Sequence, residues 1–142
     1  MADDDLTADE QLRALAALEA IAAGDDVALT VLAAPGERPL PALLSAYGQD
    51  SLHRLLIAAF KIGPDTSDAD RAERLAELND DQQARLVFIL INSLHQFADY
   101  ARDDLAAAKA IGQTVLDVMG LLTADDTAVI LLVMRQQVLQ RS

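Results

Sequence analysis

The residues best suited to chemistry are a histidine and an aspartate that stand four positions apart in an apolar stretch. His95 and Asp99 would share one face of a helix, and Asn92 extends the same polar stripe. A carboxylate beside an imidazole can orient it as a general base, or the two can bind a metal together. One histidine and one aspartate are an incomplete ligand set, so a solvent-facing helix side is the favoured interpretation. Asn92, His95 and Asp99 are therefore a candidate polar site, and we expect no metal and no cofactor.

The second candidate is the densest acidic stretch of the chain, which begins at Asp65. It does not fit a calcium-binding loop, because the twelfth position of that template needs a glutamate and an alanine stands there. Glu73 and Glu77 would share one helix face and repel each other, so an incoming Lys or Arg would relieve the repulsion. A solvated helix face is the favoured interpretation. If an acidic surface binds a partner, we expect Asp70, Glu73 and Glu77 to contact a basic protein.

Catalysis receives no support from the rest of the sequence, and we predict no catalytic residue and no enzymatic activity. The chain has no cysteine, which removes disulfides, thiolate nucleophiles and cysteine-based zinc sites. The Gly-x-Ser-x-Gly nucleophile motif is absent. Both the Gly-x-Gly-x-x-Gly motif and the phosphate-binding loop are missing as well.

Charge and hydropathy restrict the partners. The net charge is −12, and the eleven Lys and Arg residues are scattered, which disfavours nucleic-acid phosphate and anionic membranes. The uninterrupted apolar runs Leu86–Ile91 and Ala128–Met134 have six and seven residues, no other run is longer, and a membrane span needs roughly 20 residues. The acidic N-terminus is unlike a secretory signal. We expect a cytoplasmic protein that binds neither nucleic acid nor membrane.

Acidic pairs precede one helix-like segment after another. Carboxylates are favoured there, because the first turn of a helix has unpaired N–H groups and the positive end of the dipole. Much of the negative charge therefore serves the fold. The four pairs are Asp25-Asp26, Asp80-Asp81, Asp103-Asp104 and Asp125-Asp126. Three further start signals pair a capping side chain with an acid or amide three residues later: Thr7 with Glu10, Asn79 with Gln82 and Thr123 with Asp126. Gly24 should end the first helix.

These signals predict an all-α protein, a single compact bundle of six to eight helices of unequal length. Residues 1–6 would be an acidic flexible tail and residues 7–142 one helical domain. Gly48 should end a short turn before a separate helix, and Gly112 should mark close packing against a helix of this chain or of a second copy. The expected helices are 7–23, 26–34, 42–47, 51–62, 67–78, 80–100, 103–119 and 124–140. Those at about 80–100 and 124–140 carry the most apolar runs and should be largely buried.

The leading functional hypothesis is a non-enzymatic helical protein–protein interaction module, such as an adaptor, regulator or accessory protein. The high apolar content also favours self-association, so we expect a homo-oligomer. The first alternative is an acidic inhibitor or nucleic-acid mimic that occupies a basic cleft. In size class and charge the chain is similar to the acidic helical immunity proteins that neutralise nuclease toxins, although it shares no motif with them. The second alternative is a metal-binding helical protein that uses His95 and Asp99.

Overall fold

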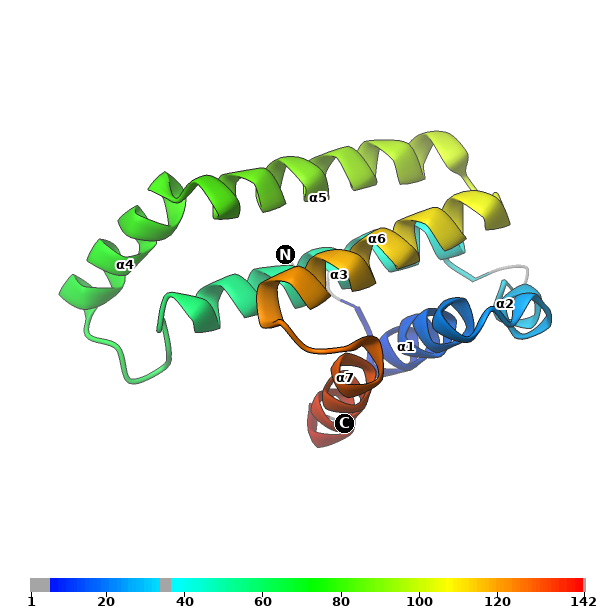
Figure 1. Cartoon of the computed structure of the whole chain (residues 1–142), viewed down its shortest axis with the longest axis horizontal. Helices are drawn as coiled ribbons and strands as arrows, with labels where there is room; N and C mark the ends of the chain where they lie inside the picture. Colours follow the sequence, from blue (N-terminus) through cyan, green and yellow to red (C-terminus); the bar gives the residue numbers. More distant parts are fainter. Residues whose placement is uncertain (1–5, 34–36, 142) are drawn as a thin grey trace.

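The computed structural model describes residues 6–33 and 37–141, and within these ranges the chain forms seven helices and no strand (Figure 1). The prediction of a compact all-α bundle is confirmed. The tail expected at residues 1–6 lies outside the described residues, apart from Leu6. The helices are α1 (Ala8–Ala23), α2 (Asp26–Leu32), α3 (Leu40–Ala59), α4 (Asp68–Asp80), α5 (Gln82–Ala101), α6 (Leu105–Thr123) and α7 (Thr127–Arg141).

The acidic pairs do begin helices, as predicted. One aspartate of each pair accepts a hydrogen bond from the backbone N–H three residues further on, at 2.9–3.1 Å. The four capping residues are Asp25, Asp81, Asp104 and Asp126. At the start of α1, Thr7 and Glu10 form the expected capping box, and Gly24 ends that helix with φ +70°.

Two of the predicted capping residues are wrong. Asn79 was expected to cap the helix near residue 80, but it lies in the last turn of α4, and Asp81 caps α5 instead. Thr123 was expected to open the last helix, but it ends α6, where its hydroxyl donates to the carbonyl of Met119 at 2.8 Å. In both places the aspartate that caps the helix lies two or three residues further along the chain.

The predicted helix break at Gly48 is also wrong, because α3 continues without interruption from Leu40 to Ala59. Gly48 is buried, and a Cβ built on it would lie 2.5 Å from Cγ2 of Val115 on α6. The glycine therefore allows two helices to approach closely and does not end either of them. Pro41, in the first turn, fits the start of a helix.

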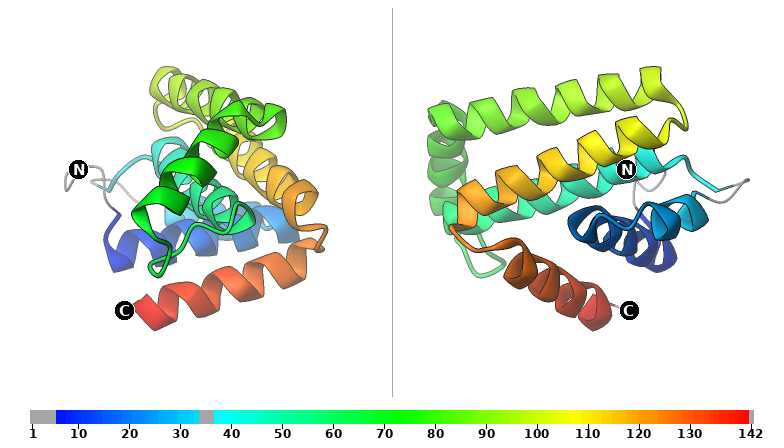
Figure 2. Two further views of the ribbon diagram at one scale, coloured as in Figure 1. Left: turned by 90° about the vertical axis from the view of Figure 1, so that its left-hand side faces the viewer. Right: turned by 45° about the vertical axis from the view of Figure 1, so that its right-hand side comes forward.

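The helices form three layers around α3 and α6, which lie side by side in the middle (Figures 1 and 2). Helix α5 covers one side of this pair, and α1 packs on the other side together with α2 and α7. Helix α4 meets the start of α5 at a corner and lies at one end of the bundle, between the level of α5 and that of α3 (Figures 1 and 2).

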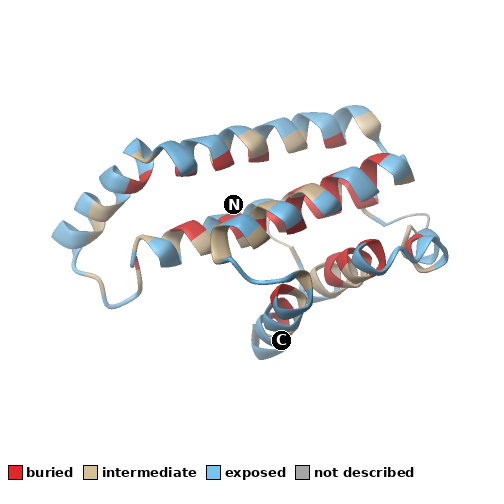
Figure 3. Cartoon of the chain, viewed as in Figure 1, coloured by how far each residue is buried: buried red, intermediate tan, exposed pale blue. Residues whose placement is uncertain are grey.

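The expectation that the helices at 80–100 and 124–140 are largely buried is wrong (Figure 3). Helix α5 buries only Ala84, Val87, Ile91 and Ala98, and the residues of α7 whose burial is described include only three buried ones, Ile130, Met134 and Val138. Both helices lie at the edge of the bundle with neighbours on one side only. An uninterrupted apolar run on such a helix must turn part of its side chains to solvent.

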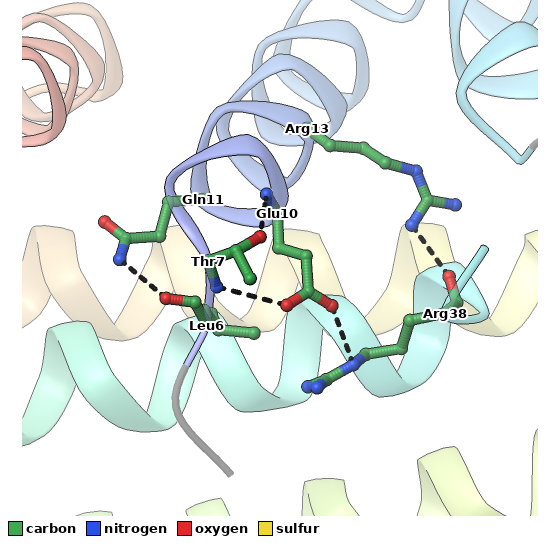
Figure 4. A network of polar contacts seen from close by, with 6 residues as sticks. All are labelled: Leu6, Thr7, Glu10, Gln11, Arg13 and Arg38. Carbon is green, nitrogen blue, oxygen red and sulfur yellow. Dashed lines mark hydrogen bonds and ion pairs between the residues drawn. The ribbon is translucent and has the colours of Figure 1, made fainter. Parts of the chain in front are cut away.

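The connector between α2 and α3 is fastened to α1 by charged side chains (Figure 4). Glu10 accepts from the Thr7 backbone N–H and forms a 3.0 Å ion pair with Arg38. Arg13 donates to the backbone carbonyls of Leu32 and Arg38 at 2.8 and 2.7 Å. Held by these contacts, Arg38 also lines a hollow between α3 and α5.

Candidate functional site

A polar hollow lies between α3 and α5 and contains part of the predicted polar site. Its volume is about 490 Å³, and we call it the α3–α5 hollow. The structure brings His95 and Asp99 together here, and it adds His53, which the sequence could join to them only through the fold. Asn92, the third predicted residue, is exposed on α5 and does not line the hollow. The lining residues are Arg38, Ala42, Ala46, Gln49, Asp50, His53, His95, Ala98 and Asp99.

His95 is held by α3 and not by Asp99. Its Nδ1 lies 2.8 Å from the Ser45 hydroxyl, and its Nε2 contacts Oε1 of Gln49. The Gln49 oxygen can only accept, so Nε2 donates, and in the neutral ring Nδ1 accepts the proton of Ser45. Ser45 is 2% exposed and is the one buried polar side chain of the described core. The pair of hydrogen bonds therefore joins α5 to the central helix.

The same geometry argues against nucleophilic catalysis by Ser45. The hydroxyl is buried and does not line the hollow, so a substrate in the hollow would not meet it. The residue sits in the middle of α3, where backbone N–H groups are used within the helix and cannot stabilise an oxyanion. This serine–histidine contact is structural.

The other charged groups of the hollow are mostly paired outside it. Arg38 pairs with Glu10, and Asp50 pairs with Arg54 at 3.1 Å. The His53 ring meets Phe88 edge to face, with centroids 6.3 Å apart. The described residues contain no group of three or more side chains that could hold a metal ion. The hollow offers a few hydrogen-bonding groups and no convergent set, so it carries no assigned chemistry.

The predicted acidic partner face lies on α4 and is exposed. Arg74 stands four positions after Asp70 on this helix, but its guanidinium donates to the backbone carbonyl of Lys61. Arg71 likewise donates to the carbonyl of Gly63 at 2.9 Å. Among the described residues, the carboxylates of Asp70, Glu73 and Glu77 make no ion pair.

A feature that was not predicted from the sequence is an apolar stripe on the outward side of α5. Leu86 is 65% exposed, Ile89 62%, Phe97 44% and Tyr100 89%. Ser93 lies in the middle of this series and is exposed as well. These five residues are the α5 outer stripe. The sequence pattern that could have identified the stripe is the spacing of these residues by three, four, four and three positions. This spacing places them on one helix face, opposite the buried face.

The fold defines the chain as an all-α bundle with apolar side chains left open on its edge helices. Comparison with protein-family models, with curated proteins and with solved structures found no match. Among the described residues one helix, α6, has the length and apolar composition of a membrane span. A core helix has the same properties, and α6 packs against α3 and α1 in this structure.

Proposed function

We propose that this protein is a non-enzymatic helical interaction module that binds a protein partner through the α5 outer stripe. One observation carries the proposal: four large apolar side chains of the stripe lie in solvent on a single helix face. An aliphatic and aromatic stripe of this kind, with polar flanks, is typical of protein–protein interfaces.

The architecture supports this function. Helix α5 is fixed by its packing on α3 and α6 and by the contacts of His95 with Ser45 and Gln49. A rigid helix presents its side chains without a large ordering cost on binding. Neither α4 nor the connection to α6 crosses the outward side of α5, which stays open along its length (Figures 1 and 2).

Affinity capture with the full chain tests the proposal. Wild-type protein and the variant L86E/Y100E are used as baits at equal concentration, and bound proteins are quantified. We expect the variant to capture at least tenfold less of each partner than wild type does, and this includes wild-type chain that is added to the sample. Val27, 77% exposed on α2, provides the matched control V27E, which should bind like wild type. Equal capture by all three baits would contradict the proposal.

The second candidate function is an acidic inhibitor that occupies a basic cleft. The observation that favours it is the turning of Arg71 and Arg74 towards backbone carbonyls, while the carboxylates of α4 form no ion pair within the described part of the chain. Binding of this kind should weaken steeply as salt rises and should be lost in E73K/E77K. Binding through the α5 outer stripe should respond weakly to both changes. A partner that is insensitive to salt and to E73K/E77K rules out the acidic face.

A further inference from the structure

The α5 outer stripe is symmetric about its central residue. Leu86 and Tyr100 stand seven positions before and after Ser93, and Ile89 and Phe97 stand four positions before and after it. A two-fold interface is self-complementary, so that if residue i contacts residue j of the partner, j also contacts i. An antiparallel pairing of α5 with a second copy satisfies this condition. In this pairing Leu86 of one copy faces position 100 of the other copy, and Ile89 faces position 97.

The residue on the symmetry axis is small. Ser93 would face its own equivalent, and its hydroxyl is already satisfied by the Ile89 carbonyl at 2.9 Å. A small side chain at the crossing point lets two helix axes approach to about 8 Å, the close end of the usual range. The large side chains on both sides can then interdigitate.

The charges beside the stripe favour the same arrangement. Arg85 and Asp99 each immediately precede a stripe residue, so both lie on the same flank of α5. A two-fold axis through Ser93 brings Arg85 of one copy to within about 3 Å, along the helix axis, of the level of Asp99 in the other. Neither side chain makes an ion pair with another described residue. A parallel pairing would instead place the Arg85 flanks of the two copies on opposite sides of the interface, so this ion pair could not form.

The stripe also lies in a neutral part of a strongly acidic chain. Between residues 82 and 100 the only charged side chains are Arg85 and Asp99, whereas the whole chain carries −12. Two copies repel each other over their acidic surfaces, and a helix without net charge allows a closer approach than an acidic one.

We propose that the occupant of the α5 outer stripe is a second copy of this chain, packed antiparallel on a two-fold axis at Ser93. The inference rests on the proposed function and names the partner of that surface. One helix pair buries less than the roughly 800 Å² per partner of a standard interface. We therefore expect a weak, reversible dimer.

Sedimentation equilibrium of the full chain tests the proposal with a charge exchange. Ile89 and Phe97 can contact each other only between the two copies, because they stand eight positions apart along one helix. We expect wild type to dimerise, I89E and F97K each to be monomeric, and I89E/F97K to recover the dimer through two Glu–Lys pairs. In a parallel dimer the double variant would be worse than either single variant. Thermal melts of all variants check that the exposed substitutions leave the fold intact.

Cross-linking gives the geometry directly, because the chain has no cysteine of its own. S93C should oxidise to a covalent dimer, since the two sulfurs would meet on the axis. Y100C should not, because its equivalents would lie about 21 Å apart along the helix. Equal cross-linking of both variants, or a dimer that survives I89E, overturns the proposal. If the wild type is monomeric while capture of another protein still depends on Leu86 and Tyr100, the inference fails and the interaction module stands.

Discussion

Gly48 on α3 lies directly against the side chain of Val115 on α6. A Cβ added at Gly48 would lie 2.5 Å from Cγ2 of Val115 and 3.4 Å from Cγ1. Val115 is 1% exposed and β-branched, so it has no alternative rotamer into which it can retreat. The contact explains why a glycine persists in the middle of a long helix.

Gly48→Ala should destabilise the protein although alanine is the better helix former. The propensity gain is about 1 kcal/mol, whereas overpacking a rigid core contact costs about 1–3 kcal/mol and sometimes more. Urea unfolding followed by circular dichroism measures the difference. Gly120→Ala is the matched control, because its Cβ would meet ordinary contacts at 3.6 and 4.0 Å, and it should be neutral or stabilising. A G48A variant as stable as wild type would show that α3 and α6 can separate at little cost.

Gly112→Ala should cost less than Gly48→Ala. The prediction that Gly112 marks close helix packing is supported, with α1 of the same chain as the neighbour: a Cβ would lie 2.4 Å from Cδ1 of Ile21. That atom is the far end of a flexible side chain, which can rotate away. We expect the propensity gain to offset most of the clash, which leaves a net change within about 1 kcal/mol. The same unfolding experiment compares the two variants, and a larger loss for G112A would contradict this ranking.

Replacement of the two aspartates of one acidic pair should change the stability of the protein by clearly different amounts. Asp81 accepts from the Ala84 N–H at 2.9 Å, whereas Asp80 is the last residue of α4 and makes no capping bond for α5. Asp81→Ala should cost about 1 kcal/mol, and Asp80→Ala should change stability by less than about 0.5 kcal/mol. Thermal melts of the two variants check this. Equal losses would indicate that general charge, and not the cap, matters at this helix start.

The contact between Ser45 and His95 should appear as a coupling energy. Each of S45A and H95A removes one partner of the 2.8 Å hydrogen bond, and their effects should therefore not add. We expect a coupling of about 1 kcal/mol in a double-mutant cycle of unfolding free energies. Strict additivity would mean that the hydrogen bond does not join α5 to α3. Asn92→Ala, on the same helix but exposed, is the control and should add independently to S45A.

Tyr47 should make the protein sensitive to alkaline pH. Burial raises the pKa of its phenol from 10.0 to about 12, and the nearby Ser51 hydroxyl acts in the opposite direction. The native state therefore keeps a proton that the unfolded chain loses, so the stabilisation is complete below pH 10.0 and is lost as pH rises towards 12. The free energy of unfolding should fall by up to about 1.4 kcal/mol per pH unit in this window. Tyr47→Phe should remove that slope, and an unchanged slope in Y47F would assign it to other groups.

Local signals predicted much of the fold. The aspartate caps, the Thr7–Glu10 box and the end of α1 at Gly24 follow from contacts between a side chain and the backbone about three residues away. Such contacts form in any tertiary setting, which is why the helix starts were mostly correct. The Gly48 error shows the limit: a glycine that ends a helix and a glycine that lets a second helix approach are the same residue in the sequence.

The candidate surfaces could be predicted only in part. His95 and Asp99 were identified as a polar pair, but the contacts of His95 with Ser45 and Gln49 join residues about 50 positions apart. The apolar run of α5 predicted burial, because composition gives hydrophobicity without saying how many neighbours a helix will have. The sequence alone determined most of the helices, most of their caps and the acidic charge, since these depend on near neighbours. Only the tertiary structure decided that α3 and α6 form the centre and that the outward side of α5 is left open, because coverage depends on packing between distant segments.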